Sequence, residues 1–153
     1  MEETEKRKRI LVVDDDDAIR TLLLTVLERR GFLVDTARDG AAAMELLDRH
    51  VYPVILLDLM MPQMNGWEVI ACLAERPPEG RPLILVLTAG EAAYDSIPDM
   101  VAGTIRKPFD VELVGDTVSA CLTAIGERER GQHGPKPEGR PPGPPRQGKL
   151  SRA

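Results

Sequence analysis

Residues 54–66 read VILLDLMMPQMNG, an apolar run that ends in Asp58 and gives way to a loop containing proline and glycine. Residues 10–17 read ILVVDDDD, a second apolar run that passes directly into four aspartates. Neither run alternates apolar with polar residues, which is typical of strands covered on both faces of a parallel sheet. The carboxyl ends of parallel strands meet at one edge. We therefore predict that Asp14, Asp15 and Asp58 lie close together there.

The rest of the chain alternates between short apolar runs and longer segments with helical spacing. The predicted strands occupy residues 10–14, 33–37, 54–58, 83–88 and 101–106, and the predicted helices occupy about residues 17–30, 39–50, 66–76 and 111–126. This alternation predicts an α/β fold, in which helices cover both faces of a parallel sheet.

Local signals mark where the helices begin and end. Gly31 and Gly126 each follow an apolar helical run, so we expect them to end the first and last helices. Asp110 is placed to cap the start of the last helix. The segment 90–100 is short and contains Pro98, so we expect at most two turns of helix there.

Length and charge predict one folded domain with two extensions. The 153 residues, 42% of them hydrophobic, suffice for one core, which we place at residues 8–126 after a charged extension at 1–7. Residues 127–153 are rich in Pro and Gly and are expected to be a disordered tail. That tail holds seven basic and three acidic residues, a charge of +4, which leaves −9 for the rest. An acidic body makes nucleic acid an unexpected partner.

The chain shows no sign of a targeting or membrane segment. Its first residues, MEETEKRKR, are charged throughout, and no apolar run approaches the roughly 18 residues that a membrane-spanning helix needs. We therefore expect no membrane insertion and a cytoplasmic location.

The clustered carboxylates predict a cation site. Asp14, Asp15 and Asp58 would repel one another without a compensating charge, and hard oxygen ligands of this type suit Mg²⁺ better than Zn²⁺. The alternative is that the four aspartates simply favour a helix N-terminus. For Asp16 and Asp17 we favour the role at a helix N-terminus. For Asp14 and Asp15 we favour a role as metal ligands.

Two further polar residues follow strand ends at the same edge. Thr88 ends the fourth predicted strand, and Lys107 follows the fifth. A carboxylate that acts as nucleophile, a nearby lysine and metal, and a hydroxyl donor are the groups that phosphoryl transfer requires. Pro108 makes a cis peptide bond plausible directly after the lysine.

The sequence resembles the receiver domain of bacterial two-component response regulators. The matching segments are ILVVDDD, ARDGAAAMELL, LLDLMMPQMNGWEVI, VLTA and RKPFD, which occur in the family's order across about residues 8–126. The resemblance implies a flavodoxin-like fold: a doubly wound sheet of five parallel strands in the order 2-1-3-4-5, with helices on both faces. The short segment 90–100 indicates that the fourth helix of this fold is shortened here.

The resemblance also implies a role for each site residue. Asp58 matches the phosphoacceptor, and Asp14 and Asp15 match the acidic pair that holds Mg²⁺. Met60 matches the position that offers its backbone carbonyl to the metal, and Thr88 and Lys107 match the residues that contact the phosphoryl group. The implied donor is a phosphohistidine on a histidine kinase or a histidine phosphotransfer protein.

Two features depart from the family pattern. The family usually has Tyr or Phe three residues before the lysine, as part of a switch with the hydroxyl residue Thr88, but this chain has Thr104. The interval from Thr88 to Lys107 is also a few residues shorter than usual. Both changes affect a face that many members use for dimerisation or output.

The function expected is that of a single-domain response regulator, which is not an enzyme and signals through protein–protein contacts. One alternative is a phosphatase of the haloacid-dehalogenase type, but that chemistry needs an acid/base where Met60 lies. A second alternative is a pseudo-receiver that binds partners without being phosphorylated. The basic tail could contact an acidic partner or nucleic acid, although a solvated linker is the more ordinary interpretation.

Overall fold

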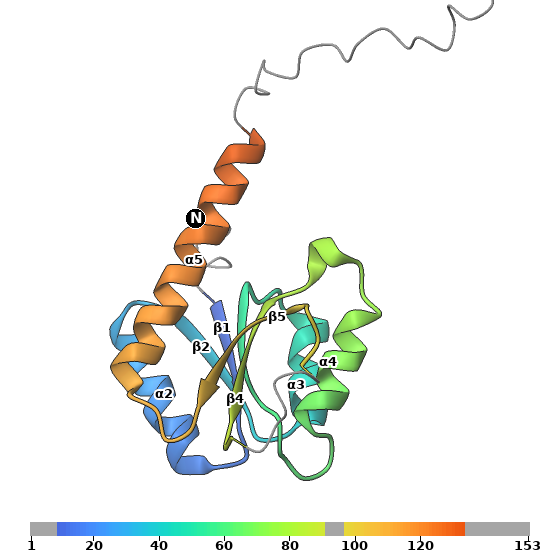
Figure 1. Cartoon of the computed structure of the whole chain (residues 1–153), viewed down its shortest axis with the longest axis vertical. Helices are drawn as coiled ribbons and strands as arrows, with labels where there is room; N and C mark the ends of the chain where they lie inside the picture. Colours follow the sequence, from blue (N-terminus) through green and yellow to red (C-terminus); the bar gives the residue numbers. More distant parts are fainter. Residues whose placement is uncertain (1–8, 91–96, 134–153) are drawn as a thin grey trace, which may run out of the picture.

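A computed structural model describes residues 9–90 and 97–133 (Figure 1). The elements are β1 (Arg9–Val13), α2 (Asp17–Arg29), β2 (Leu33–Ala37), α3 (Gly40–Arg49), β3 (Val54–Asp58), α4 (Gly66–Ala74), the 3-10 helix η1 (Pro78–Gly80), β4 (Leu83–Thr88), β5 (Val101–Arg106) and α5 (Val111–His133). The predicted alternation of strands and helices is confirmed.

The sheet is parallel and its strands lie in the order β2-β1-β3-β4-β5. β3 pairs with both β1 and β4, so it runs through the centre of the sheet and all five of its residues are buried. This is why its sequence lacks polar alternation: each side chain, on either face, meets a covering layer. The expected order 2-1-3-4-5 is confirmed.

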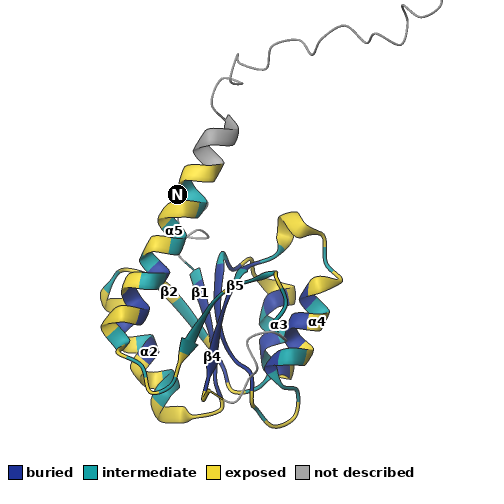
Figure 2. Cartoon of the chain, in the orientation of Figure 1, coloured by how far each residue is buried: buried dark blue, intermediate teal, exposed yellow. Residues whose placement is uncertain are grey.

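Successive strand residues enter two separate apolar clusters. In β3, for example, Ile55 and Leu57 pack with α3 and α4, whereas Val54 and Leu56 pack with α2 and α5. Figure 2 shows the buried strands between these two helical layers, whose outer surfaces are exposed. The burial of two apolar faces supplies the main stabilisation of the sheet.

Helix starts carry the side-chain caps that their sequences indicate. Asp16 accepts hydrogen bonds from the backbone N–H groups of Ala18 and Ile19, so this aspartate caps α2 as expected. Asp39 caps α3 through the N–H of Ala42, at 2.8 Å. In each case the carboxylate satisfies donors that the helix itself cannot pair.

The first helix ends where the sequence indicates. Gly31 follows α2 with a φ of +89°, a conformation that suits the residue after a helix.

The last helix begins where the sequence indicates. Asp110 accepts a hydrogen bond from the N–H of Glu112 at the start of α5, as its predicted capping role requires.

The prediction that the last helix ends at Gly126 is wrong. α5 continues to His133, because a glycine inside a helix only weakens it, while the residues on either side of Gly126 favour helix. Residues 127–133, which we had assigned to the tail, are therefore helical. The rest of the predicted tail, the N-terminal extension at 1–7 and most of the predicted short helix at 90–100 lie outside the described residues.

No helix within residues 9–90 and 97–133 combines the length and hydropathy needed to cross a membrane.

Candidate functional site

Three carboxylates meet at the carboxyl edge of the sheet. Asp14 follows β1, Asp15 comes next, and Asp58 ends β3; one oxygen of each lies within 4.8 Å of the others. Asp14 is fully buried and Asp58 nearly so, whereas Asp15 is exposed. The predicted convergence of these three residues is therefore present.

Lys107 lies against the two buried carboxylates. Its Nζ is 2.8 Å from Oδ2 of Asp14 and 3.5 Å from Oδ2 of Asp58. Burial acts to lower the pKa of Lys107, but the two aspartates outweigh it and the pKa is raised. The lysine is therefore a fixed positive charge beside two acids that lie at neighbouring strand ends.

The environment of Asp58 favours its protonated form. Burial, followed by the negative charge of Asp14, raises the pKa of Asp58 to about 6, against the opposing effects of the Met60 N–H and Lys107. An added cation would remove this penalty, since it would stabilise the charged carboxylate directly. The site is electrostatically incomplete without one.

The remaining predicted site residues lie around Asp58. Thr88 ends β4, the neighbouring strand, where it is buried and its Oγ1 accepts the N–H of Gly90 at 3.1 Å. Met60 donates its backbone N–H to Oδ1 of Asp58 at 3.1 Å, and its side chain is exposed. The peptide bond between Lys107 and Pro108 is cis, as expected.

Two residues support the site, although the sequence had assigned neither of them a role in it. The guanidinium of Arg20 donates to the carbonyl of Asp14 at 2.8 Å and so holds the turn between β1 and α2. Gly66 packs against the backbone after β3, where an added Cβ would lie 2.7 Å from the Cα of Leu59. The LDLMMPQMNG segment includes this glycine, but its close contact depends on how the loop returns to the strand.

Thr104 lies on β5 opposite Val86, and no aromatic side chain occupies this position. It lines a cavity of about 390 Å³ between β5 and α5, together with its neighbour Gly103. The other apolar residues that line this cavity include Leu85, Ile105 and Val114, which belong to the cluster beneath α2 and α5.

The donor set fits a hard divalent cation. Oδ2 of Asp14 is buried, and the Nζ of Lys107 at 2.8 Å partly offsets its charge. Asp15 and Asp58 supply further carboxylate oxygens within reach of the same point. An arrangement of oxygen ligands alone, open to water on the side of Asp15, suits Mg²⁺.

Comparison with known proteins identifies the family. The profile described as Response regulator receiver domain matches residues 10–119. The chain is 38% identical over 118 residues to the alkaline phosphatase synthesis transcriptional regulatory protein PhoP of Bacillus subtilis, which covers 75% of this chain and 48% of PhoP. It is also 38% identical over 117 residues to the response regulator MprA of Mycobacterium leprae, which covers 74% of this chain and 50% of MprA.

Solved structures agree with this assignment. A CheY-like receiver domain protein from Methanospirillum hungatei superposes with a TM-score of 0.66 at 31% identity, covering 81% of this chain and 98% of that one. The response regulator TrrA of Thermotoga maritima, solved in complex with Mg²⁺ and BeF, gives a TM-score of 0.67 at 30% identity, covering 74% and 98%.

The comparisons establish the family of this chain, but they cover only part of the length of its curated relatives. The chain spans about half the length of the curated relatives described above. Receiver domains are phosphoacceptor signalling modules of two-component systems rather than enzymes, so the phosphatase alternative is wrong. Because the family profile covers most of the sequence and the sheet order agrees, this chain belongs to the response regulator receiver domain family.

Proposed function

We propose that Asp58 of this chain accepts a phosphoryl group in a Mg²⁺-dependent reaction. One observation carries the proposal: Asp58 ends β3 within 4.8 Å of the carboxylates of Asp14 and Asp15, with the Nζ of Lys107 at 3.5 Å. Acids crowded in this way have no stabilising role of their own, because each raises the free energy of the others' charged forms.

Each residue has a role that follows from its position. Asp14 and Asp15 would hold Mg²⁺ with Asp58 and the backbone carbonyl of Met60. The metal supplies positive charge that offsets the phosphoryl oxygens. Lys107 would pair with one of those oxygens, and the hydroxyl of Thr88 would donate a hydrogen bond to another.

The proposed donor is the phosphohistidine of a histidine kinase or a histidine phosphotransfer protein. A carboxylate oxygen of Asp58 forms a bond to phosphorus while the P–N bond of the phosphohistidine breaks. The electron pair stays on the imidazole nitrogen, which takes up a proton from water. The product on this chain is an acyl phosphate.

Phosphorylation with a small-molecule donor tests the proposal directly. Acetyl phosphate with Mg²⁺ should add the mass of one phosphoryl group to the intact protein, and chelation of the metal should prevent it. Asp58→Asn should abolish the added mass, whereas Asp48→Asn, which changes an acid on α3, should not. An equal mass increase in the Asp58→Asn variant would refute the assignment.

A pseudo-receiver remains the second candidate, and Thr104 is the observation that favours it. Without an aromatic ring at this position, phosphorylation could fail to alter the outer face of β5. A pseudo-receiver would show no mass increase with acetyl phosphate or with phosphorylated histidine kinases, although its fold and its thermal stability would be intact.

We propose that the phosphorylated domain transmits its state through contacts with another protein. The acidic charge of the part that precedes residue 127 supports this and argues against direct contact with nucleic acid. One of the relatives described above, PhoP, is named as a transcriptional regulatory protein, and this chain matches 48% of its length. Capture experiments with the phosphorylated and unphosphorylated chain test the proposal, since a specific partner should be retained by one form only.

A further inference from the structure

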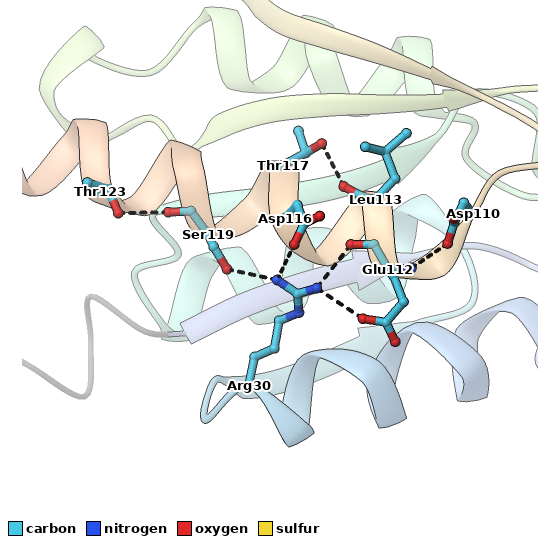
Figure 3. Close-up of polar contacts among 8 residues, drawn as sticks. All are labelled: Arg30, Asp110, Glu112, Leu113, Asp116, Thr117, Ser119 and Thr123. Carbon is cyan, nitrogen blue, oxygen red and sulfur yellow. Dashed lines mark hydrogen bonds and ion pairs between the residues drawn. The ribbon is translucent and has the colours of Figure 1, made fainter.

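Arg30, directly after α2, makes an unusually complete set of contacts with α5. Its Nη2 donates to the carbonyl and the carboxylate of Glu112, at 3.0 and 3.1 Å. Its Nη1 lies 2.9 Å from the carboxylate of Asp116 and 3.4 Å from the hydroxyl of Ser119. Figure 3 shows the guanidinium of Arg30 reaching from the end of α2 to these three residues of α5.

One face of α5 carries the residues that contact the side chain of Arg30. Glu112, Asp116 and Ser119 recur every three or four residues, so they share one face of α5. Gly115 lies between them on that face and is buried, and an added Cβ would be 2.6 Å from Cζ of Arg30. Glycine weakens a helix relative to alanine, so its place here is explained by the space that it leaves for the guanidinium.

The same two helices are also connected through the proposed phosphoryl site. At the site, Oδ1 of Asp14 accepts the N–H of Asp16, which caps α2, and Oδ2 of Asp14 lies 2.8 Å from Nζ of Lys107. Lys107 precedes α5 by a connection of only a few residues. Arg30 joins the two helices again at the other end of α2. The first turns of α5 are therefore linked to both ends of α2, indirectly through Asp14 and Lys107 and directly through Arg30.

We propose that Arg30 is a positioning residue for phosphoryl transfer. Seated on Gly115, it fixes the first turns of α5 and thereby holds Lys107 in register with Asp14 and Asp58. Arg30 acts through Lys107 and does not itself touch the reacting groups. This inference rests on the proposed function of Asp58, but the contact with Gly115 can be tested separately.

A thermal double-mutant cycle tests the contact. By helix propensity alone, Gly115→Ala would raise the melting temperature. Because the added methyl group would displace Arg30 from its contacts, we expect the rise in melting temperature on Gly115→Ala to be smaller in the wild-type background than when Arg30→Ala is already present. Gly80→Ala, where an added Cβ meets nothing within 4 Å, is the glycine control. An equal rise in melting temperature for Gly115→Ala in both backgrounds would overturn the proposal.

The rate of phosphorylation by acetyl phosphate and Mg²⁺ tests the positioning role. Arg30→Ala and Gly115→Ala should each slow phosphorylation severalfold, and the double variant should be no slower, since both changes remove the same contact. The double variant should melt higher than Arg30→Ala alone yet react equally slowly, which a purely stabilising role would not produce. Arg29→Ala removes the neighbouring charge and should react as the wild type does.

Three outcomes separate the proposals. If the wild type is not phosphorylated, the proposed function of Asp58 fails, while the thermal cycle still decides whether Arg30 and Gly115 interact. If Arg30→Ala is phosphorylated at the wild-type rate, the positioning role is wrong and the function of Asp58 stands. If the rates simply follow the melting temperatures, Arg30 is structural only, and the proposal is likewise overturned.

Discussion

At the scale of single residues, the site places charged side chains in buried positions. Asp14 is fully buried and Asp58 nearly so, and Lys107 is the only lysine among residues 9–90 and 97–133. One ammonium group cannot fully compensate two buried carboxylates that also face Asp15. The folded protein therefore holds Asp58 at an unfavourable free energy until a cation binds.

The raised pKa of Asp58 predicts how stability depends on pH without metal. Asp58 keeps its proton up to about pH 6 when folded, but releases it near its ordinary value of 3.8 when unfolded. The folded state therefore binds more protons between these values, so stability falls as pH rises through this window. At neutral pH the loss reaches about 3 kcal/mol at most, since one pKa unit corresponds to about 1.4 kcal/mol.

Asp58→Asn should consequently be more stable than the wild type at neutral pH. Urea unfolding in the presence of a chelator measures the free energy of unfolding, and Glu79→Gln, an exposed acid on η1, is the control. Saturating Mg²⁺ should reduce the difference, because in the wild type it also stabilises the charged form of Asp58, which the variant lacks. A destabilised Asp58→Asn variant in the absence of metal would contradict this explanation.

At the scale of the elements, the two parts of α5 are stabilised in different ways. Cys121, Leu122 and Ile125 pack against the apolar cluster beneath α2 and α5, whereas Glu127 and Arg128 are exposed. In Figure 1 the end of α5 projects beyond the sheet. The helix past Gly126 therefore depends on its own propensity, and the helix before it on tertiary packing.

Deletion of residues 127–153 should change stability little. Among the side chains of α5 whose burial the structure describes, up to Arg128, the deletion removes only the exposed Glu127 and Arg128. We therefore expect the melting temperature to move by less than about 3 °C. Ile125→Ala, by contrast, removes half-buried apolar surface and should lower the free energy of unfolding by about 1–2 kcal/mol. A deletion more harmful than Ile125→Ala would show that the end of α5 contributes to the packed domain.

At the scale of the whole molecule, the site and the outer faces are connected through few residues. Lys107 links the end of β5 to α5, and Thr88 links β4 to the loop that begins at Gly90. A phosphoryl group on Asp58 would recruit both side chains. A change at one edge of the sheet could thereby alter the exposed surface of β5 and α5.

Lys107→Ala should separate phosphorylation from this wider response. Phosphorylated wild type should show altered amide exchange in β5 and the first turns of α5, whereas the phosphorylated variant should show a much smaller change. Arg49→Ala, which removes a cation at the end of α3, should behave as the wild type. Equal changes in exchange for the wild type and Lys107→Ala would contradict the role assigned to the lysine.

The resemblance to the receiver family implied the order of the sheet, and the residue patterns themselves predicted the convergence of Asp14, Asp15 and Asp58. The reason is local: apolar runs without alternation indicate buried parallel strands, and parallel strands present their carboxyl ends at one edge. The caps Asp16 and Asp39 act within one helical turn, so they too are visible in the sequence.

Other features depended on tertiary structure. The place of Arg30 on Gly115 joins residues 85 positions apart, so no local pattern reveals it. The end of α5 was mispredicted because Gly126 is an ordinary stop signal, whereas the length of a helix also depends on what its preceding turns pack against. Sequence periodicity indicated which residues are buried, and the sequence itself shows which strand ends are acidic. Only the tertiary structure decided that Lys107, from a strand end distant in the sequence, lies 2.8 Å from Asp14 and 3.5 Å from Asp58.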